Sequence, residues 1–486
     1  MKLHKLTLLL FSILGLITSA QATLKNDKIT LKPNMVVEYN KLPSSVESIG
    51  EAFTEGVFYG RLRTNIFMYD WEDETSSRVD HKTMGVGGSF IYKTAPLSGF
   101  SSTVGIYTSQ NPQWFNENES DVGVAKAGKD VFSRRKTLNT GDYGMTVLGQ
   151  AYIQYDYSKT SIVAGRQIFE SVFTKSNDTK MIPNTFDGVS ATIKDFDKTT
   201  IQLAYFTSQK LRDHTVAHDV LAYDPNDKYS QNDDSAVNKN LTVERIGDDN
   251  KLLIGSVTNK SIKNLKANIS YMMVPDVVSN LTLEAHYTIP VSKGWKVIPG
   301  IRYMKQFDNL GANYNVASYS GSGAVGYNNP TSLDSSLLAT RLDFKNGAFL
   351  GRLGYSHIED KADIIAPWRG FATGGFTRAM AQFNWRANTK TYMARVGYDF
   401  GKADMIPGFS IMARYCIQDF DDKKDDVQAD SNILHIDMRQ NIGKNLEAKI
   451  RLGFVDADNS ILKSNSVDYK SDVSYNEYRF ELNYFF

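Results

Sequence analysis

The sequence of 486 residues has a single cysteine and almost no net charge. Because Cys416 is the only cysteine, an intramolecular disulfide framework and a cysteine-cluster metal site are both excluded. The 55 lysine and arginine residues are balanced by 54 aspartate and glutamate residues, whereas a nucleic-acid-binding protein should be strongly basic. The chain is nevertheless 41% hydrophobic, with 26 Tyr and 26 Phe, which is too apolar and too aromatic for a disordered protein.

Long hydrophobic runs are also scarce, and the only one near helical length lies at the N-terminus. The apolar run 6–17 follows Lys2 and Lys5 and precedes the small-residue motif 20–22, which is typical of a secretory signal and its cleavage site. A retained transmembrane helix is the alternative interpretation, but the run is shorter than the roughly 20 residues needed to cross a bilayer. We therefore expect the protein to be exported.

Beyond this run, apolar and polar side chains alternate along most of the chain. In segment 475–486 the even-numbered residues from Tyr478 to Phe486 are apolar or aromatic, and the odd-numbered residues from Glu477 to Asn483 are polar. A period of two predicts β-strands with one apolar and one polar face. Two architectures fit such strands: a soluble sandwich that buries its apolar face, and a membrane barrel that turns its apolar face to lipid.

Three observations favour the membrane barrel. The alternating segments are about 10–14 residues long, more than the usual ~5–6 of soluble sheets and close to the length of a tilted spanning strand. The connections alternate between tight turns and long loops. Aromatic residues stand at the segment ends, where girdles at the membrane surfaces are expected: Tyr69, Trp71, Tyr92, Tyr107, Tyr157, Tyr303, Tyr398 and Tyr484.

The predicted fold is therefore all-β, a transmembrane antiparallel β-barrel of about 18 strands with short periplasmic turns and long external loops. An even number of strands places both chain ends on the periplasmic side. The predicted organisation is a signal peptide at 1–22, a periplasmic N-terminal segment at 23–54 and the outer-membrane barrel at 55–486. The strands are expected at 55–71, 82–94, 97–108, 142–157, 159–169, 186–196, 198–209, 251–259, 263–273, 278–290, 293–307, 335–346, 347–358, 388–400, 407–420, 430–441, 445–456 and 475–486.

Arginine is the notable residue of the polar face. A lipid-facing arginine near the midplane would cost ~2–4 kcal/mol, so an inward orientation is strongly favoured. Guanidinium groups bind carboxylates in a two-pronged manner, and a wall of them suits the passage of anions. The alternative is a structural role in which they pair with luminal acids. Ten arginines are expected to line the lumen: Arg61, Arg63, Arg302, Arg341, Arg352, Arg395, Arg414, Arg439, Arg451 and Arg479.

Two kinds of loop segment carry further hypotheses. Segment 376–387 loses the period-two pattern, and it is either a short helix folded into the pore, with Arg378 and Arg386 facing the passage, or an external flap. The acidic runs 421–426 and 72–74 are either solvated loop tips or sites where calcium bridges the loops to lipopolysaccharide.

An enzyme is the second class to consider, as a barrel protease or phospholipase of the outer membrane, and an adhesin or structural porin is the third. No G-x-S-x-G elbow is present, and His435 and Asp437 share a polar face without an obvious serine beside them. His214 and His218 have a spacing that suits a metal, but an isolated loop pair is a weak signal. We therefore predict no catalytic residue, no metal site and no cofactor.

Several short motifs resemble the OprD-type outer-membrane porin family. They are Gly165-Arg166-Gln167, the stretch 178–188 (DTKMIPNTFDG), the stretch 56–63 (GVFYGRLR) and Gly87-Gly88. Lys180 stands where the family usually has arginine, which keeps the charge but loses the fork, and it is a third candidate for the constriction. Within this family, the sequence resembles epsilonproteobacterial members.

The resemblance implies an 18-stranded barrel in the bacterial outer membrane, often trimeric, that conducts small carboxylate-bearing solutes such as amino acids. The expected partners are accordingly small anionic solutes, outer-membrane lipid and lipopolysaccharide, and further copies of the chain in a homotrimer, with no nucleic acid.

Overall fold

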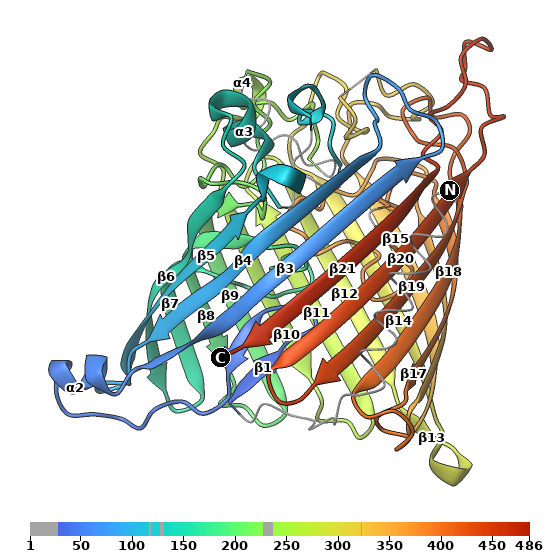
Figure 1. Cartoon of the computed structure of the whole chain (residues 1–486). Coiled ribbons are helices and arrows are strands. Elements are labelled where there is room, and N and C mark those ends of the chain that lie inside the picture. Colours follow the sequence, from blue (N-terminus) through green and yellow to red (C-terminus); the bar gives the residue numbers. More distant parts are fainter. Residues whose placement is uncertain (1–27, 116–117, 127–130, 227–236, 322, 381) are drawn as a thin grey trace.

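The computed structural model describes residues 28–115, 118–126, 131–226, 237–321, 323–380 and 382–486. Their strands form one closed antiparallel barrel of eighteen long strands and the two-residue strand β13 (Figure 1). The predicted all-β barrel is confirmed. The predicted signal peptide, residues 1–22, lies outside the described residues.

Each long strand overlaps one predicted segment, and the ends differ by a few residues. The barrel strands are β3 (Val57–Trp71), β4 (His81–Lys93), β5 (Phe100–Gln110), β6 (Met145–Tyr157), β7 (Thr160–Gln167), β8 (Thr185–Ile193), β9 (Thr199–Lys210), β10 (Leu252–Asn259), β11 (Leu265–Val274), β12 (Val278–Tyr287), β13 (Ile289–Pro290), β14 (Lys296–Asp308), β15 (Ser335–Asn346), β16 (Phe349–Ile358), β17 (Lys390–Asp399), β18 (Phe409–Asp419), β19 (Ser431–Ile442), β20 (Leu446–Ala457) and β21 (Tyr475–Phe485).

The elements outside the barrel wall are short. A hairpin of β1 (Ile29–Leu31) and β2 (Val37–Tyr39) precedes the barrel, and the helices are α2 (Ile49–Thr54), α3 (Arg134–Thr140) and α4 (Val243–Ile246), with single 3-10 turns at Gln113–Phe115, Glu119–Asp121 and Ser292–Gly294. Within the described part of the chain, no helix has the length and apolar character needed to cross a membrane.

The last strand closes the barrel against the first, because β21 pairs with β3 in antiparallel register. Alternation then sets the two faces of the wall. On β3, Leu62 is 48% exposed on the outer surface, while Arg61 and Arg63 on either side of it are buried within the barrel. The inward orientation predicted for the arginines follows from this alternation.

Three aromatic residues that we expected in the membrane-surface girdles, Tyr69, Trp71 and Tyr107, face inward instead, and the Trp71 ring packs against those of Tyr69 and Tyr475. Tyr69 is buried and its hydroxyl donates to Glu477 Oε2 at 2.8 Å, and the buried Tyr107 hydroxyl accepts from Gln150 Nε2 at 2.7 Å. Tyr69 lies an even number of residues from Arg61, so it shares the inner face of β3. Position at a strand end was the wrong criterion, and the parity of the residue number decides the face.

One half of the barrel is filled by its own long loops. The inner faces of β8–β12 and β14–β16 carry buried apolar residues such as Phe206, Ile254 and Met304. They pack against loop residues that include Trp368 and Trp385, and we call β8–β16 with these loops the filled half. Burial of such large side chains is a main source of folding free energy, so the loops are fixed inside the lumen. The remaining lumen lies against β17–β21 and β3, which we call the open wall.

Candidate functional site: the open wall and its two cavities

Charged residues of the open wall and of the adjoining strands β15 and β16 stand directly opposite one another in the strand register. The first row crosses β15 to β19 and consists of Asp343, Arg352, Arg395, Arg414 and His435. The second row crosses β19 to β21 and consists of Asp437, Arg451 and Arg479. Like charges directly opposite one another in a sheet are destabilising. The repulsion among Arg352, Arg395 and Arg414 therefore opposes folding, and it is offset in part by the contact of Arg352 with Asp343 and by that of Arg414 with a loop carbonyl.

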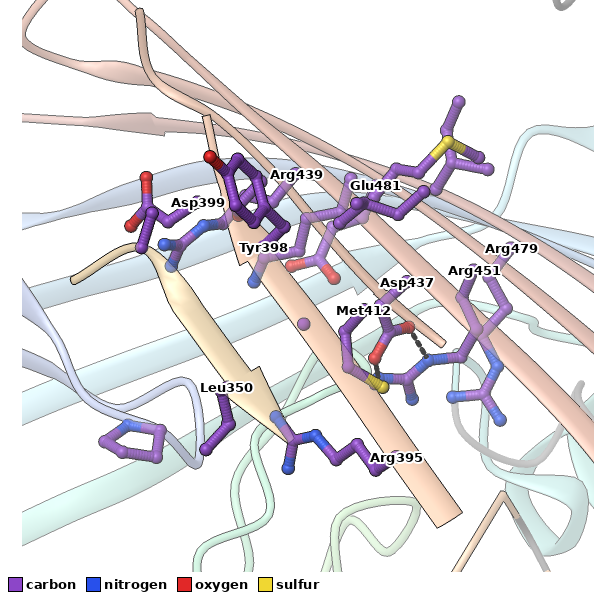
Figure 2. A pocket seen from close by; sticks show the side chains of 18 of the residues that line it. Leu350, Arg395, Tyr398, Asp399, Met412, Asp437, Arg439, Arg451, Arg479 and Glu481 are labelled. Atoms are coloured by element: carbon purple, nitrogen blue, oxygen red, sulfur yellow. Dashed lines mark hydrogen bonds and ion pairs between the residues drawn. The ribbon is translucent and has the colours of Figure 1, made fainter. Parts of the chain in front are cut away.

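The inner cavity lies at the end of the barrel that carries the short turns, and its volume is about 670 Å³ (Figure 2). Asp437 accepts two hydrogen bonds from Arg451, at 2.6 Å from Nε and 3.0 Å from Nη2. Of the described residues lining this cavity, Asp399, Asp437 and Glu481 are acidic and seven are basic: Lys345, Arg395, Lys402, Arg439, Lys449, Arg451 and Arg479.

The outer cavity, of about 650 Å³, lies towards the long loops and is more strongly unbalanced in charge. Asp437 is the one acidic residue among the described residues that line it. Eleven basic residues surround it: Arg78, Lys126, Arg134, Lys180, Arg212, Arg369, Arg378, Arg386, Arg414, Arg451 and Arg479. Positively charged side chains therefore dominate the described lining of this cavity.

The three residues that we predicted at the constriction, Lys180, Arg378 and Arg386, all line the outer cavity. The Lys180 ammonium lies 4.1 Å from the centre of the Phe67 ring, and the Arg386 guanidinium pairs with Asp363 at 3.2 Å. Segment 376–387 forms turns and irregular backbone in its described residues, so the predicted short helix is wrong, although the segment does lie inside the barrel.

Arg378 is the most crowded of these cations. Its guanidinium carbon lies 3.6 Å from the centre of the Phe371 ring. Its pKa is lowered well below its ordinary value, first by burial and then by repulsion from other arginines, namely Arg212, Arg414, Arg369 and Arg451. A bound anion would relieve this repulsion.

Four of the ten predicted luminal arginines hold the loop between β16 and β17 by its backbone. Arg302 donates to Ala372 O at 2.7 Å, and Arg341 and Arg352 donate to Gly375 O at 2.7 and 2.8 Å. Arg414 donates to the carbonyl oxygen of the crowded Arg378. These guanidinium groups satisfy carbonyls that the irregular loop leaves without a helix or sheet partner.

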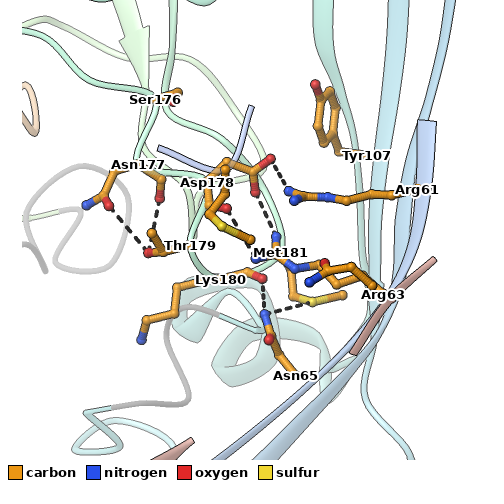
Figure 3. A network of polar contacts seen from close by, with 12 residues as sticks. Arg61, Arg63, Asn65, Tyr107, Ser176, Asn177, Asp178, Thr179, Lys180 and Met181 are labelled. Atoms are coloured by element: carbon orange, nitrogen blue, oxygen red, sulfur yellow. Dashed lines mark hydrogen bonds and ion pairs between the residues drawn. The ribbon is translucent and has the colours of Figure 1, made fainter. Parts of the chain in front are cut away.

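Arg61 and Arg63 have a different environment, because both are buried against the loop between β7 and β8 (Figure 3). Arg63 Nη1 lies 2.9 Å from Asp178 Oδ1, Arg61 pairs with the other carboxylate oxygen, and Arg63 Nη2 reaches Glu481 at 2.9 Å. Neither arginine is among the residues that line the two cavities. The structure thus brings Arg395, Arg414, Arg439, Arg451 and Arg479 to the cavities and places the other five predicted arginines in contacts with acids or loops.

Sequence reasoning missed the loop cations Arg212 and Arg369, which also line the outer cavity. Alternation gives no direction to a side chain in a loop, and Lys180, Arg378 and Arg386 were the only loop cations predicted to face the passage. The signal that could have found them is the Trp368-Arg369-Gly370 triplet, an unusual bulky and charged combination in the middle of a long loop.

The candidate metal pair and one of the two acidic runs make contacts with other groups of the protein. His214 Nδ1 and His218 Nε2 lie 2.8 Å apart, and in the described residues no group of three or more His, Cys, Asp and Glu side chains could hold a metal ion. Within the acidic run 421–426, Lys424 is buried and its ammonium pairs with Asp360 and Asp421 at 2.5 Å each.

Comparison with known proteins agrees with this geometry. The family described as "outer membrane porin, OprD family" matches residues 122–485, which is more than half of the chain. The chain belongs to the OprD family of outer-membrane porins. It is therefore a channel-type protein of the bacterial outer membrane, as its barrel also indicates.

Solved structures of low sequence identity share the fold of this OprD-family porin. Acinetobacter baumannii OccAB2 is 17% identical with a TM-score of 0.67, and 90% of this chain and 99% of that chain are covered. Acinetobacter baumannii OccAB3 is 15% identical (TM-score 0.65, 89% and 99% covered) and Pseudomonas aeruginosa OccK8 (OprE) is 13% identical (TM-score 0.65, 90% and 99% covered). A search among curated protein sequences found no match.

Proposed function

We propose that this OprD-family porin conducts small anionic solutes, above all those that bear a carboxylate, along the open wall from the outer cavity to the inner cavity. The observation that carries the proposal is the charge of the outer cavity, with eleven basic residues and one acidic residue among its described lining. Fixed charges of one sign in a water-filled passage concentrate the opposite ion and exclude the like ion.

The arrangement of the cations supports release as well as capture. Asp399 and Glu481 line the inner cavity alone and lower its positive charge relative to that of the outer one. An anion that enters at the outer end therefore meets its strongest attraction first and a weaker one near the periplasm. Conduction requires binding that is strong enough for entry and weak enough for exit.

The test is single-channel recording in planar bilayers, with reversal potentials measured across a salt gradient and then with a panel of small organic anions and cations. We expect steady conductance with a preference for anions. The most informative variant is Arg395→Glu with Arg439→Glu, because both residues line the inner cavity and neither donates to a loop carbonyl in the contacts described above.

The double variant should weaken or reverse the preference for anions. The matched control is Lys198→Glu with Lys293→Glu, in two exposed turns that line neither cavity. Unchanged selectivity in the Arg395 and Arg439 variant, or the absence of conductance, would overturn the proposal. Association into a homotrimer and contact with lipopolysaccharide stay predictions.

A further inference from the structure

The N-terminal hairpin, residues 28–40, lies inside the barrel at the end with the short turns. β1 and β2 pair through Ile29 and Tyr39 and through Leu31 and Val37. Ile29, Val37 and Met35 are buried, and the first two belong to a hydrophobic cluster with Phe485 of the barrel wall. Tyr39 contributes a ring contact with Tyr59 of β3, at 5.4 Å between centroids. The hairpin is thus fastened to the wall where β21 meets β3.

The tip of the hairpin stands between the two cavities. Pro33 lines both of them, Met35 lines the inner cavity and Asn34 lines the outer one. The other residues that line both are Thr179 of the loop between β7 and β8 and three wall residues, Asp437, Arg451 and Arg479. The junction of the cavities is therefore bounded on three sides, by the open wall, by this loop and by the hairpin tip.

Each side of the tip has a specific contact. The Asn34 amide donates to the Glu170 carboxylate of the same loop, which also accepts from the Ser176 hydroxyl at 2.6 Å. On the other side, the Lys449 ammonium of the wall lies 2.7 Å from Met35 Sδ. Met35 has a φ of 68°, a left-handed backbone conformation that residues other than glycine adopt rarely and at a cost in energy. The tip is thus held across the passage, from the loop to the wall.

The rest of the hairpin is held less firmly. A third cavity, of about 360 Å³, separates residues 29–31 from the turn between β19 and β20. The pairing of β1 with β2 covers three residues on each strand, and an isolated two-stranded hairpin is marginally stable in water. Its position therefore depends on the contacts at the tip, on the ring contact with Tyr59 and on the packing of Ile29 and Val37 with Phe485.

We propose that the hairpin 28–40 is a constriction element of the channel, and that Pro33, Asn34 and Met35 limit the size of the solutes that pass between the cavities. The inference rests on the proposed conduction along the open wall. It assigns to a segment that precedes the barrel a part of the selectivity that the long loops alone would otherwise provide.

The first experiment compares single-channel conductance of the full chain with a variant that lacks residues 28–40 and keeps the export signal. Removal of one side of the junction should raise the conductance to roughly twice its value and admit larger organic anions, because conductance follows the free cross-section of a pore. Equal conductance and an equal size limit would overturn this inference and leave the proposed function intact. If neither protein conducts, the proposed function fails and this inference fails with it.

The second experiment places a thiol at the tip without a deletion. Asn34→Cys is treated with a cationic or an anionic methanethiosulfonate reagent during recording, and the control is Leu42→Cys, in the exposed segment that follows the hairpin. The native Cys416 is fully buried, so it does not compete for the reagent. Both reagents should reduce the current through Asn34→Cys at least by about half, and leave Leu42→Cys unchanged. Equal responses of the two variants would overturn the assignment of the tip to the passage.

Discussion

The filled half and the open wall are built from strands of the same kind, yet their interiors differ completely. In the filled half the inner face is apolar near the long loops, and the loops fold back and bury it. Along the open wall the inner face carries arginines, and two cavities remain. An apolar surface gains free energy when a loop covers it, whereas a row of like charges would lose its hydration without gaining partners. The composition of the inner face thus decides which part of a wide barrel stays open.

The largest expected effect comes from emptying the filled half. Trp368 is 1% exposed and its Nε1 donates to Val220 O at 2.8 Å, so Trp368→Ala should destabilise the packed loops by about 3–5 kcal/mol. Thermal unfolding in detergent and protease cleavage of intact cells would measure this. The control is Trp114→Ala, since Trp114 is 75% exposed, and equal stability of the two variants would contradict the packing described here.

The second largest effect on stability should come from two ion pairs, that of Asp178 with the arginines of β3 and that of Asp187 with Arg166. Asp178→Asn leaves two buried guanidinium groups without their shared carboxylate, which should cost about 3 kcal/mol, at the low end of the range because Glu481 still pairs with Arg63. Asp187→Asn breaks the partly exposed pair with Arg166 and should cost about 1 kcal/mol or less. The same unfolding measurement in detergent compares them, and a reversed order would show that the Asp178 cluster does not hold the loop.

A smaller effect, on selectivity rather than stability, should separate arginines that line a cavity from those that do not. Arg395→Gln is expected to reduce the anion-to-cation permeability ratio roughly twofold, since it removes one of several fixed charges from the inner cavity. Arg61→Gln should leave that ratio unchanged, because Arg61 lines neither cavity. Reversal potentials of the two variants measure this ratio. A lower ratio in Arg61→Gln, with an unchanged ratio in Arg395→Gln, would contradict the assignment of the two arginines.

The smallest expected effect is that of pH on the stability of the outer rim, where Lys424 of the loop after β18 pairs with Asp360 of the loop after β16. Burial would raise the pKa of Asp421, but the hydrogen bonds from Lys424 and Asn388 hold it below its ordinary value. The pair of Asp421 and Lys424 therefore contributes its full stabilisation at pH values above the ordinary carboxylate pKa. This stabilisation is lost as the pH falls through the lowered pKa of Asp421. The protection factor for hydrogen exchange in residues 420–430, which is the intrinsic rate at each pH divided by the observed rate, should fall in acid for the native chain. In Lys424→Met the protection factor should change less with pH.

The strands were largely predictable from the sequence because alternation reports directly on burial. The pattern weakened where the interior is packed, as at Leu252 and Ile254, whose side chains face a protein core inside the lumen while Val257 faces outward. Arg166 was not among the arginines predicted to line the lumen; it stands opposite Asp187 in the register of β7 and β8, and its Nε lies 2.7 Å from that carboxylate.

The site was predictable only in part, since its loops follow no period. The alternation indicated the inner face for these arginines, but their division between cavities and loop contacts depends on partners far along the chain. Asp178 is separated from Arg63 by 115 residues, and the Ala372 carbonyl from Arg302 by 70. Neither separation leaves a trace in local composition.

The register of Arg352, Arg395 and Arg414 has one more consequence. These residues are aligned perpendicular to their strands, and strands of a membrane barrel are tilted by about 45°. With neighbouring strands about 4.8 Å apart, each step from one arginine to the next rises ~3.4 Å along the barrel axis. The charges therefore form an oblique ramp around the inside of the barrel, and a solute that exchanges one guanidinium for the next would turn about the axis as it descends.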